Sequence, residues 1–282
     1  MKHRPFKQVD VFTAEPYRGN PLAVVIDAAG LSDDGMQRFA RWTNLSETTF
    51  LLPPQSPPAD YRVRIFTPGG ELPFAGHPTI GSCHAWLQAG GRPHDPDFIV
   101  QECSVGMVRL RRTGTQLAFA APAMRRSEPD AAMLEQLLPI LGLAPHEVIA
   151  AQSLDNGPVW LALLVDRPET VLRLAPDHGR LAQLGQKVGV AARYPVAGSA
   201  GPHLEVRGFA APIGIPEDPV TGSLNASLAQ WLIAEGRLPE HYIASQGARL
   251  GRAGRIDLRR DAPGQVWVGG DAVTCIDGFV LL

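Results

Sequence analysis

The chain has 282 residues, of which 45% are hydrophobic and 19% are charged, a composition typical of a globular protein with a full core. Its formal net charge of −2 excludes the broad positive surface that binding to nucleic acid or to an anionic membrane requires. Because no apolar run approaches the ~18 residues of a membrane span and the start lacks a signal-peptide core, we expect a cytoplasmic protein.

The first part of the chain is predicted to form a sheet with one helix on its face. Residues 9–12 and 22–26 have strand patterns joined by a turn, which favours antiparallel pairing. Ser32 is predicted to cap a helix, and the apolar stripe of that helix contains Met36, Phe39, Ala40 and Thr43. A strand that ends at residue 52 and an alternating strand over 61–66 follow.

Two later stretches of the chain are near copies of each other. Residues 71–79, E-L-P-F-A-G-H-P-T, and residues 217–225, E-D-P-V-T-G-S-L-N, share the pattern E-x-P-x-x-G at a separation of 146 residues. Each stretch is followed by a run that is apolar on most sides and ends at Gly90 or Gly236, which predicts a buried helix. In the second copy Ser223 is predicted to be the N-cap. The repetition indicates an internal duplication and therefore two similar domains.

The remaining elements place the domain boundary near residue 120. Short strands are predicted over 98–105, 107–111 and 116–120, then a helix over 131–143, a strand over 159–165, and a surface helix that contains Leu181, Leu184 and Val188. We expect an N-terminal domain over 1–120 and a C-terminal domain over 121–270. Residues 271–282 are predicted to form a last strand, which is a candidate to complete the first domain. The loop around Pro195 to Pro202 is predicted to be the most flexible segment.

The starts of the two buried helices are expected to contribute to one site. First-turn N–H groups attract anions, and if the two halves face each other these helix ends flank one cleft. Glu47 lies among small hydroxyl and aliphatic residues, where partial desolvation would raise its pKa. A carboxylate and the imidazole of His77 beside two helix ends suit the removal of a proton from carbon, a reaction that needs no cofactor.

Other chemistries fit the sequence less well. The glycine-containing stretches lack the spacing of a Walker loop or of a dinucleotide fingerprint. Ser223 lies in T-G-S-L-N rather than in G-x-S-x-G, which makes a hydrolase acting through Ser223 a distant alternative. His77 and His84 have no third ligand at metal spacing, so no metal site is predicted and His84 is interpreted as a packed helix residue. The three cysteines are interpreted as buried thiols rather than as a disulfide framework.

Several motifs, in the same order, resemble those of the phenazine-biosynthesis PhzF family over nearly the whole chain. They are V-D-V-F and G-N-P-L-A-V-V near the start, N-L-S-E-T-T-F, F-T-P with E-L-P-F-A-G-H-P-T, G-I-P-E-D-P-V-T-G-S, and S-Q-G-x-x-x-G-R-x-G-R-I. The resemblance implies an α+β fold like that of diaminopimelate epimerase. In that fold two pseudo-symmetric domains each form an antiparallel, barrel-like curled sheet around a central buried helix, and the site lies between them. A homodimer is also implied.

The resemblance further implies roles for particular residues. Glu47, in the S-E-T position, is the acid/base residue, and His77, Asp218 and Ser223 hold the substrate and steer the proton. The residues expected to bind the substrate lie at the starts of the two helices and are Gly76, Pro78, Thr79, Gly222 and Leu224. Epimerases and proline racemases of this fold have two cysteines before these glycines, and here those positions are Ala75 and Thr221. The resemblance therefore favours a one-carboxylate proton shuttle over a two-thiol racemase.

Two functions stay open at this point. The favoured one is a cofactor-independent isomerase acting on a small anionic, carboxylate-bearing metabolite, and the alternative is a non-catalytic ligand-binding protein that keeps the same cleft. His77 is assigned either to catalysis or to positioning. Glu71 and Glu217 are interpreted as carboxylates that stabilise turns. Leu224 and Asn225 are expected to narrow or re-polarise the pocket, so the sequence does not assign the phenazine precursor as the substrate.

Overall fold

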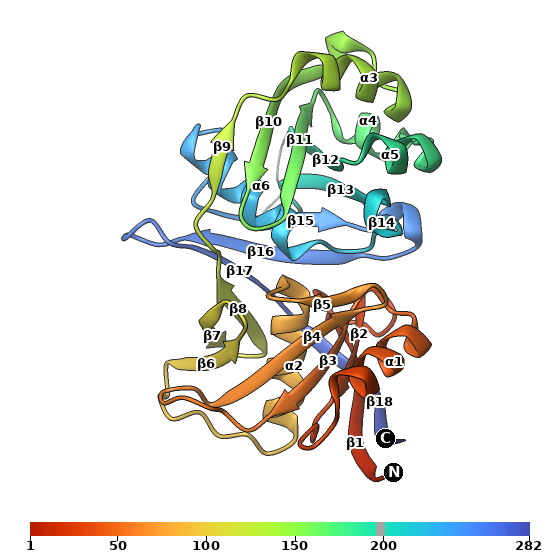
Figure 1. The fold of residues 1–282 in the computed structure, drawn as a ribbon. Helices are drawn as coiled ribbons and strands as arrows, with labels where there is room; N and C mark the ends of the chain where they lie inside the picture. Colours follow the sequence, from red (N-terminus) through yellow and green to blue (C-terminus); the bar gives the residue numbers. More distant parts are fainter. Residues whose placement is uncertain (196–200) are drawn as a thin grey trace. The chain divides into compact units, whose positions relative to one another are not determined.

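The computed structural model describes residues 1–195 and 201–282, which form two compact units (Figure 1). Unit 1 contains Met1–Ala120 and Gly269–Leu282, and unit 2 contains Ala121–Val268. Most of the loop predicted to be flexible, residues 196–200, lies outside the described residues. Within the described residues, helices and strands both contribute heavily, which confirms a mixed α and β protein.

Unit 1 is a sheet of mostly antiparallel strands. Its strands are β1 (His3–Val11), β2 (Asn20–Val25), β3 (Thr48–Leu52), β4 (Tyr61–Thr67), β5 (Gly70–Leu72), β6 (Phe98–Cys103), β7 (Gly106–Thr113), β8 (Gln116–Ala120) and β18 (Ala272–Leu281). They pair in the order β18, β1, β2, β3, β4, β6, β7, β8, with β5 added antiparallel to β4. The antiparallel pairing predicted for the first two strands is confirmed, whereas β2 with β3 and β4 with β6 are parallel.

Two helices pack on this sheet. Helix α1 (Asp33–Thr43) begins at Ser32 as predicted, because the Ser32 hydroxyl accepts a hydrogen bond from the Gly35 N–H at 3.1 Å. Its apolar side, including Phe39, packs with β2, β3 and β4. Helix α2 (Gly76–Gln88) is largely buried and contacts β1, β2, β3, β6, β8 and β18. Gly81 allows the close approach, since a Cβ there would lie 2.6 Å from a methyl carbon of Leu22.

Among its described residues, unit 2 has a second set of strands and the α-helices α3 to α6. The strands are β9 (Arg125–Ser127), β10 (Val148–Asp155), β11 (Val159–Val165), β12 (Lys187–Arg193), β13 (Leu204–Ala210), β14 (Ile215–Asp218), β15 (His241–Gln246), β16 (Gly254–Arg260) and β17 (Val266–Gly270), the last of which reaches the unit boundary. The helices are α3 (Ala131–Leu141), α4 (Pro168–Arg173), α5 (His178–Leu184) and α6 (Gly222–Ala234). Helices α3 to α5 pack with β11, β12 and β13 around one apolar cluster.

The sequence-based prediction was wrong about one boundary in unit 2. The surface helix predicted to include Val188 ends at Leu184, because Gly185 takes a left-handed conformation with φ of 73° and caps it. Val188 instead belongs to β12, which pairs parallel to β11. Strands β10 and β12 were not predicted at all.

The strand pairings of the two units follow the same pattern. In unit 1, β4 pairs antiparallel with β3 and β5 and parallel with β6. In unit 2, β13 pairs antiparallel with β12 and β14 and parallel with β15. Both units also contain a parallel pair connected through helices, β2 with β3 and β11 with β12. The repeated E-x-P-x-x-G stretch therefore occupies the same place in each ladder, directly before α2 and before α6. Within residues 1–195 and 201–282, no helix is long and apolar enough to cross a membrane.

Candidate functional site

In unit 1 the structure brings Glu47 and His77 together. Glu47 follows the loop after α1, where Asn44 reverses the chain with φ of 54° and the hydroxyls of Thr43 and Thr48 lie 2.9 Å apart. His77 is the second residue of α2. The His77 Nε2 atom lies 3.4 Å from Glu47 Oε2, and the two side chains are only 5% and 13% exposed. The pair is therefore almost dry.

A third residue, Asn20 at the start of β2, sets the protonation of this imidazole. The Asn20 Nδ2 amide donates to His77 Nδ1 at 3.3 Å, so the ring proton is on Nε2 and faces Glu47. Burial lowers the His77 pKa to about 3, which keeps the imidazole neutral near pH 7. Sequence reasoning did not assign Asn20 a role, although it belongs to the G-N-P motif of the resemblance.

The start of α2 leaves backbone donors at the same place. Its N-cap Ala75 makes no side-chain cap, and the first N–H groups of a helix have no acceptor within the helix. Gly76 and His77 supply such N–H groups, whereas Pro78 has none. Thr79, predicted to bind substrate, is fully buried, and its hydroxyl donates to the Ala75 carbonyl at 2.9 Å. Gln101 donates to the same hydroxyl at 3.1 Å.

In unit 2 the loop from Asp218 to the start of α6 is held by Gln246. The fully buried Gln246 amide donates to the Asp218 carbonyl at 2.9 Å and to Thr221 Oγ1 at 2.8 Å. Its oxygen accepts from the Thr221 N–H at 3.0 Å and from Asn225 Nδ2 at 2.9 Å. Gln246 follows the serine of the S-Q-G motif, but no pattern in the sequence connects it with residues 218–225.

Ser223 is not the N-cap that the sequence predicted. Helix α6 begins at Gly222, and Thr221 occupies the N-cap position without a side-chain cap. The Ser223 hydroxyl instead accepts a hydrogen bond from Trp160 Nε1 at 3.1 Å, and its carbonyl accepts from Asn156 Nδ2 at 2.9 Å. Both donors belong to the turn and strand after β10, which the sequence did not connect with Ser223.

The other residues predicted near the two helix starts have mainly packing or ion-pair contacts. Leu224 is fully buried, and a Cβ on Gly189 would lie 2.3 Å from its Cδ1 methyl, so its side chain packs into unit 2. Glu71 accepts two hydrogen bonds from Arg64, at 2.8 and 2.6 Å. Glu217 accepts two from Arg207, at 2.9 and 2.7 Å. The two glutamates therefore hold a paired arginine on the neighbouring strand rather than the turn N–H groups.

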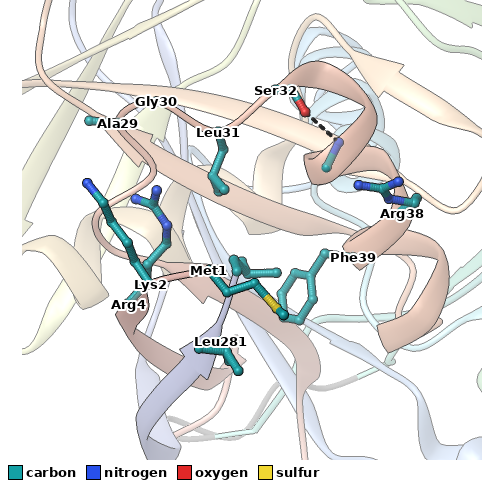
Figure 2. Close-up of a pocket in the computed structure, with 12 residues that line it drawn as sticks. Met1, Lys2, Arg4, Ala29, Gly30, Leu31, Ser32, Arg38, Phe39 and Leu281 are labelled. Carbon is teal, nitrogen blue, oxygen red and sulfur yellow. Dashed lines mark hydrogen bonds between the residues drawn. The ribbon is translucent and has the colours of Figure 1, made fainter.

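Unit 1 has a hollow that is lined by other residues. It has a volume of about 620 Å³ and is lined by the chain ends, the start of α1 and the basic residues Lys2, Arg4 and Arg38 (Figure 2). None of the predicted site residues is among those that line it. His84, interpreted as a packed helix residue, lies 3.1 Å from the Thr274 hydroxyl through its Nε2 atom. Within the described ranges no three His, Cys, Asp or Glu side chains are grouped so as to hold a metal ion.

The chain is similar to proteins of one family along its whole length. The family model described as phenazine biosynthesis-like protein, PhzC-PhzF, matches residues 9–278. Antisense-enhancing sequence 1 of Schizosaccharomyces pombe is 38% identical, with 99% of each chain covered. The trans-2,3-dihydro-3-hydroxyanthranilate isomerase of Pseudomonas aeruginosa is 34% identical, with 97% of this chain and 98% of the enzyme covered.

A solved structure has the same fold. The crystal structure of the PhzF-family phenazine biosynthesis protein of Bacillus anthracis superposes with a TM-score of 0.86 over 100% of both chains, at 24% sequence identity. These similarities confirm the resemblance seen in the sequence motifs. The chain belongs to the phenazine biosynthesis-like PhzC-PhzF family, a family of isomerases.

Proposed function

We propose that the protein is a cofactor-independent isomerase in which Glu47 moves a proton within a small carboxylate-bearing metabolite. The observation that carries the proposal is the nearly dry contact between Glu47 and a neutral His77, 3.4 Å apart. A carboxylate with little access to water is a stronger base than one in solvent, and it can hold an abstracted proton without losing it to bulk water.

The proposed reaction conserves every atom of the substrate. Glu47 takes a proton from a carbon beside a double bond, and the electrons of that C–H bond form a new double bond as the existing one moves along by one position. Glu47 then returns the proton to the far carbon. The His77 Nε2 atom lies 3.4 Å from Glu47 Oε2, so a ring proton on Nε2 is beside the carboxylate and favours its charged form between the two steps.

The relatives and the helix starts support a proposal for the substrate class. The Pseudomonas aeruginosa relative is named for trans-2,3-dihydro-3-hydroxyanthranilate, an unsaturated ring that bears a carboxylate. We propose a substrate of this kind, with its carboxylate bound by the first-turn N–H groups at Gly222 and Ser223 of α6. Asp218, on the loop held by Gln246, is assigned to binding the polar substituents of the ring.

We propose that the two units are pseudo-symmetric copies, each with its sheet curled around its own buried helix. The support is internal to each unit. The strand ladders match in order and direction, and α2 and α6 are both 13 residues long and start at the repeated glycine. We also propose a homodimer, which the exposed side chains of Trp42 and Phe279 on unit 1 support.

The test is to incubate the protein with trans-2,3-dihydro-3-hydroxyanthranilate in heavy water. Turnover is monitored by the change in absorbance, and the mass of the product is measured by mass spectrometry. The wild type should convert this compound, or a compound in a small-metabolite extract, to an isomer of the same mass or one deuteron heavier. Glu47→Gln keeps the size of the side chain but removes the base, so the rate should fall by at least about a thousandfold.

The matched control is Glu135→Gln, the same change at an exposed position of α3. It should leave the rate unchanged. A Glu47→Gln variant that is as active as the wild type would rule out the carboxylate shuttle. If the wild type converts nothing but is stabilised thermally by these ring carboxylates, and Glu47→Gln is stabilised equally, the protein is a binding protein.

A further inference from the structure

Trp160 makes a contact with Ser223 that the proposed proton shuttle does not use. Trp160 is the second residue of β11, is only 3% exposed, and donates its Nε1–H to the Ser223 hydroxyl at 3.1 Å. An indole N–H can donate a hydrogen bond but cannot accept one. In this contact the Ser223 oxygen must therefore be the acceptor, and the hydroxyl proton is left to point elsewhere.

The indole is held in place from both sides. In the β10–β11 hairpin, Trp160 lies opposite Leu154, and in the parallel ladder it lies opposite Lys187. The Lys187 ammonium also lies 6.0 Å from the centre of the Trp160 ring. A side chain fixed in this way presents its N–H in one direction.

The same hairpin also fixes the backbone of Ser223. Asn156, in the turn between β10 and β11, is 7% exposed and donates to the Ser223 carbonyl at 2.9 Å. In the turn itself, Gly157 takes φ of 111°, which suits glycine, and its N–H donates to the Asp155 carboxylate at 3.1 Å. The hairpin thus contacts Ser223 at both its side chain and its main chain.

We propose that Trp160 is a positioning residue that makes Ser223 a hydrogen-bond donor toward the ligand at the start of α6. This inference rests on the proposed function, which places the substrate carboxylate at that helix start. A donor hydroxyl beside first-turn N–H groups adds a side-chain donor for a carboxylate. Removing the indole N–H frees the Ser223 hydroxyl to rotate, and the ligand loses that donor.

The test is a cycle of variants, Trp160→Phe, Ser223→Ala and the double variant, with binding of 3-hydroxyanthranilate measured by calorimetry. The comparison ligand is 2-aminophenol, which has the same ring substituents but no carboxylate. Trp160→Phe should weaken 3-hydroxyanthranilate binding about three- to tenfold, the usual worth of one hydrogen bond, and leave 2-aminophenol binding unchanged. In the Ser223→Ala background it should have no further effect. Equal weakening of both ligands, or independent losses in the double variant, would show a packing role and overturn the proposal.

The matched control is Trp267→Phe. Trp267 is also buried in unit 2 and also donates its Nε1–H, at 2.8 Å, but to Asp261. It reports the effect of losing an indole at a position with no contact to Ser223, and it should bind both ligands as the wild type does. If Trp267→Phe reproduces the loss, the effect of Trp160→Phe is general destabilisation and the proposal is wrong.

A second measurement needs neither ligand nor turnover. The protein has five tryptophans, whose indole N–H groups give separate nitrogen-15 NMR signals. Ser223→Ala should shift the one signal that is missing in Trp160→Phe, because that indole has lost its acceptor. An unmoved signal would contradict the hydrogen bond on which the inference depends. Failure to turn over any dihydro-hydroxyanthranilate would count against the proposed isomerase, but it would leave this coupling standing.

Discussion

At the scale of single residues, the burial of neutral His77 makes the folded protein less stable at low pH. Its pKa falls from an ordinary value of 6.5 to about 3 because burial disfavours the charged imidazolium. The unfolded chain therefore binds a proton below pH 6.5 that the folded chain binds only near pH 3. The stability associated with neutral His77 is complete above pH 6.5 and is lost as the pH falls from there toward 3.

This pKa difference predicts how acid affects unfolding. Between pH 7.5 and pH 5.0 the His77 contribution should lower the free energy of unfolding by about 2 kcal/mol, an order-of-magnitude figure from the linkage relation. His77→Asn has no titrating ring, so urea unfolding of that variant should show a pH dependence smaller by this amount. His3→Asn, at an exposed position of β1, should keep the wild-type dependence. Equal pH dependence in His77→Asn and wild type would mean that His77 is not buried neutral.

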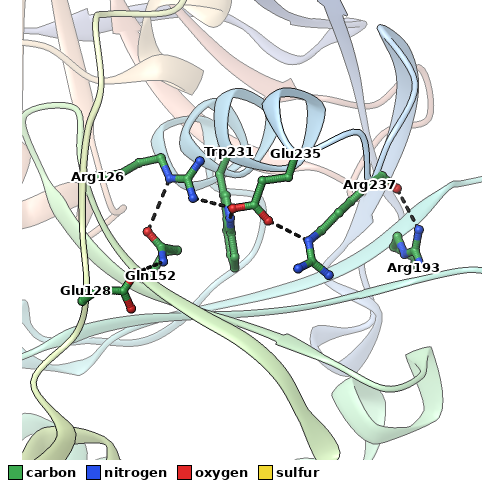
Figure 3. Close-up of polar contacts among 7 residues, drawn as sticks. All are labelled: Arg126, Glu128, Gln152, Arg193, Trp231, Glu235 and Arg237. Carbon is green, nitrogen blue, oxygen red and sulfur yellow. Dashed lines mark hydrogen bonds and ion pairs between the residues drawn. The ribbon is translucent and has the colours of Figure 1, made fainter.

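At the scale of elements, the end of α6 is tied to β9 by a polar network around Glu235 (Figure 3). The Glu235 carboxylate accepts hydrogen bonds from Trp231 Nε1 at 2.8 Å, from Arg237 at 2.7 Å, and from Arg126 of β9. A carboxylate at a helix C-terminus opposes the helix dipole, so the two arginines are needed to stabilise it there. Burial raises its pKa, but the hydrogen bonds from Arg237, Trp231 and Arg126 outweigh that effect and the pKa is lowered.

Removing the charge of Glu235 should weaken the contact between β9 and α6. Glu235→Gln keeps the size of the side chain but loses two charge-assisted contacts, which should reduce stability by about 1 kcal/mol at pH 7 and lower the Tm by a few degrees. Because the Glu235 pKa lies below its ordinary value of 4.5, the difference from wild type should disappear as the pH falls well below 4.5. Thermal melts at pH 7 and pH 3 measure both effects. Glu240→Gln, which breaks the more exposed pair with Arg260, should cost less at pH 7; a larger loss there would refute the special role of the Glu235 network.

The sequence predicted those elements whose patterns are local. Ser32 caps α1 because the cap involves only residues three apart, and the repeated stretch identified the starts of α2 and α6. Strand β10 was missed because most of its side chains are half-buried and its sequence has no strict alternation of apolar and polar residues. Val188 was placed in a helix because it is seven residues after Leu181, and the left-handed Gly185 between them overrides that spacing.

The candidate site was predicted in its residue types but not in its contacts. Glu47 and His77 are 30 residues apart, and the duplication and the resemblance connected them rather than any local pattern. The capping role predicted for Ser223 was wrong because the Ser223 hydroxyl instead accepts a hydrogen bond from Trp160, which is 63 residues away. Asn20 and Gln246 likewise act through contacts made by folding, with His77 and with the loop before α6. A single sequence carries no local pattern for such long-range partners.

At the scale of the whole molecule, unit 1 carries large apolar side chains that its own fold does not cover. Trp42 of α1 is 80% exposed, and Phe279 and Ile276 of β18 are 71% and 51% exposed. These three residues line one hollow of about 440 Å³ together with Phe6, Phe39 and Val280. A contiguous apolar patch of this kind is a usual site of association, and the same patch on a second copy is the simplest complement in a two-fold dimer.

The patch predicts that the protein is a dimer and that a charge introduced into the patch disrupts it. Light scattering should give a mass near twice the 30.3 kDa of one chain. Phe279→Glu puts a charge into the contact, where it would be desolvated without a partner, so this variant should run as a monomer with an unchanged circular dichroism spectrum. Met107→Glu, a comparable change at an exposed apolar residue of β7 that does not line the hollow, should remain a dimer. A wild-type mass of one chain at every concentration would exclude the dimer, and a dimeric Phe279→Glu would place its contact on another face.

Because Phe39 contributes both to this hollow and to the core beneath α1, loss of the dimer should also lower the Tm of the variant at low protein concentration.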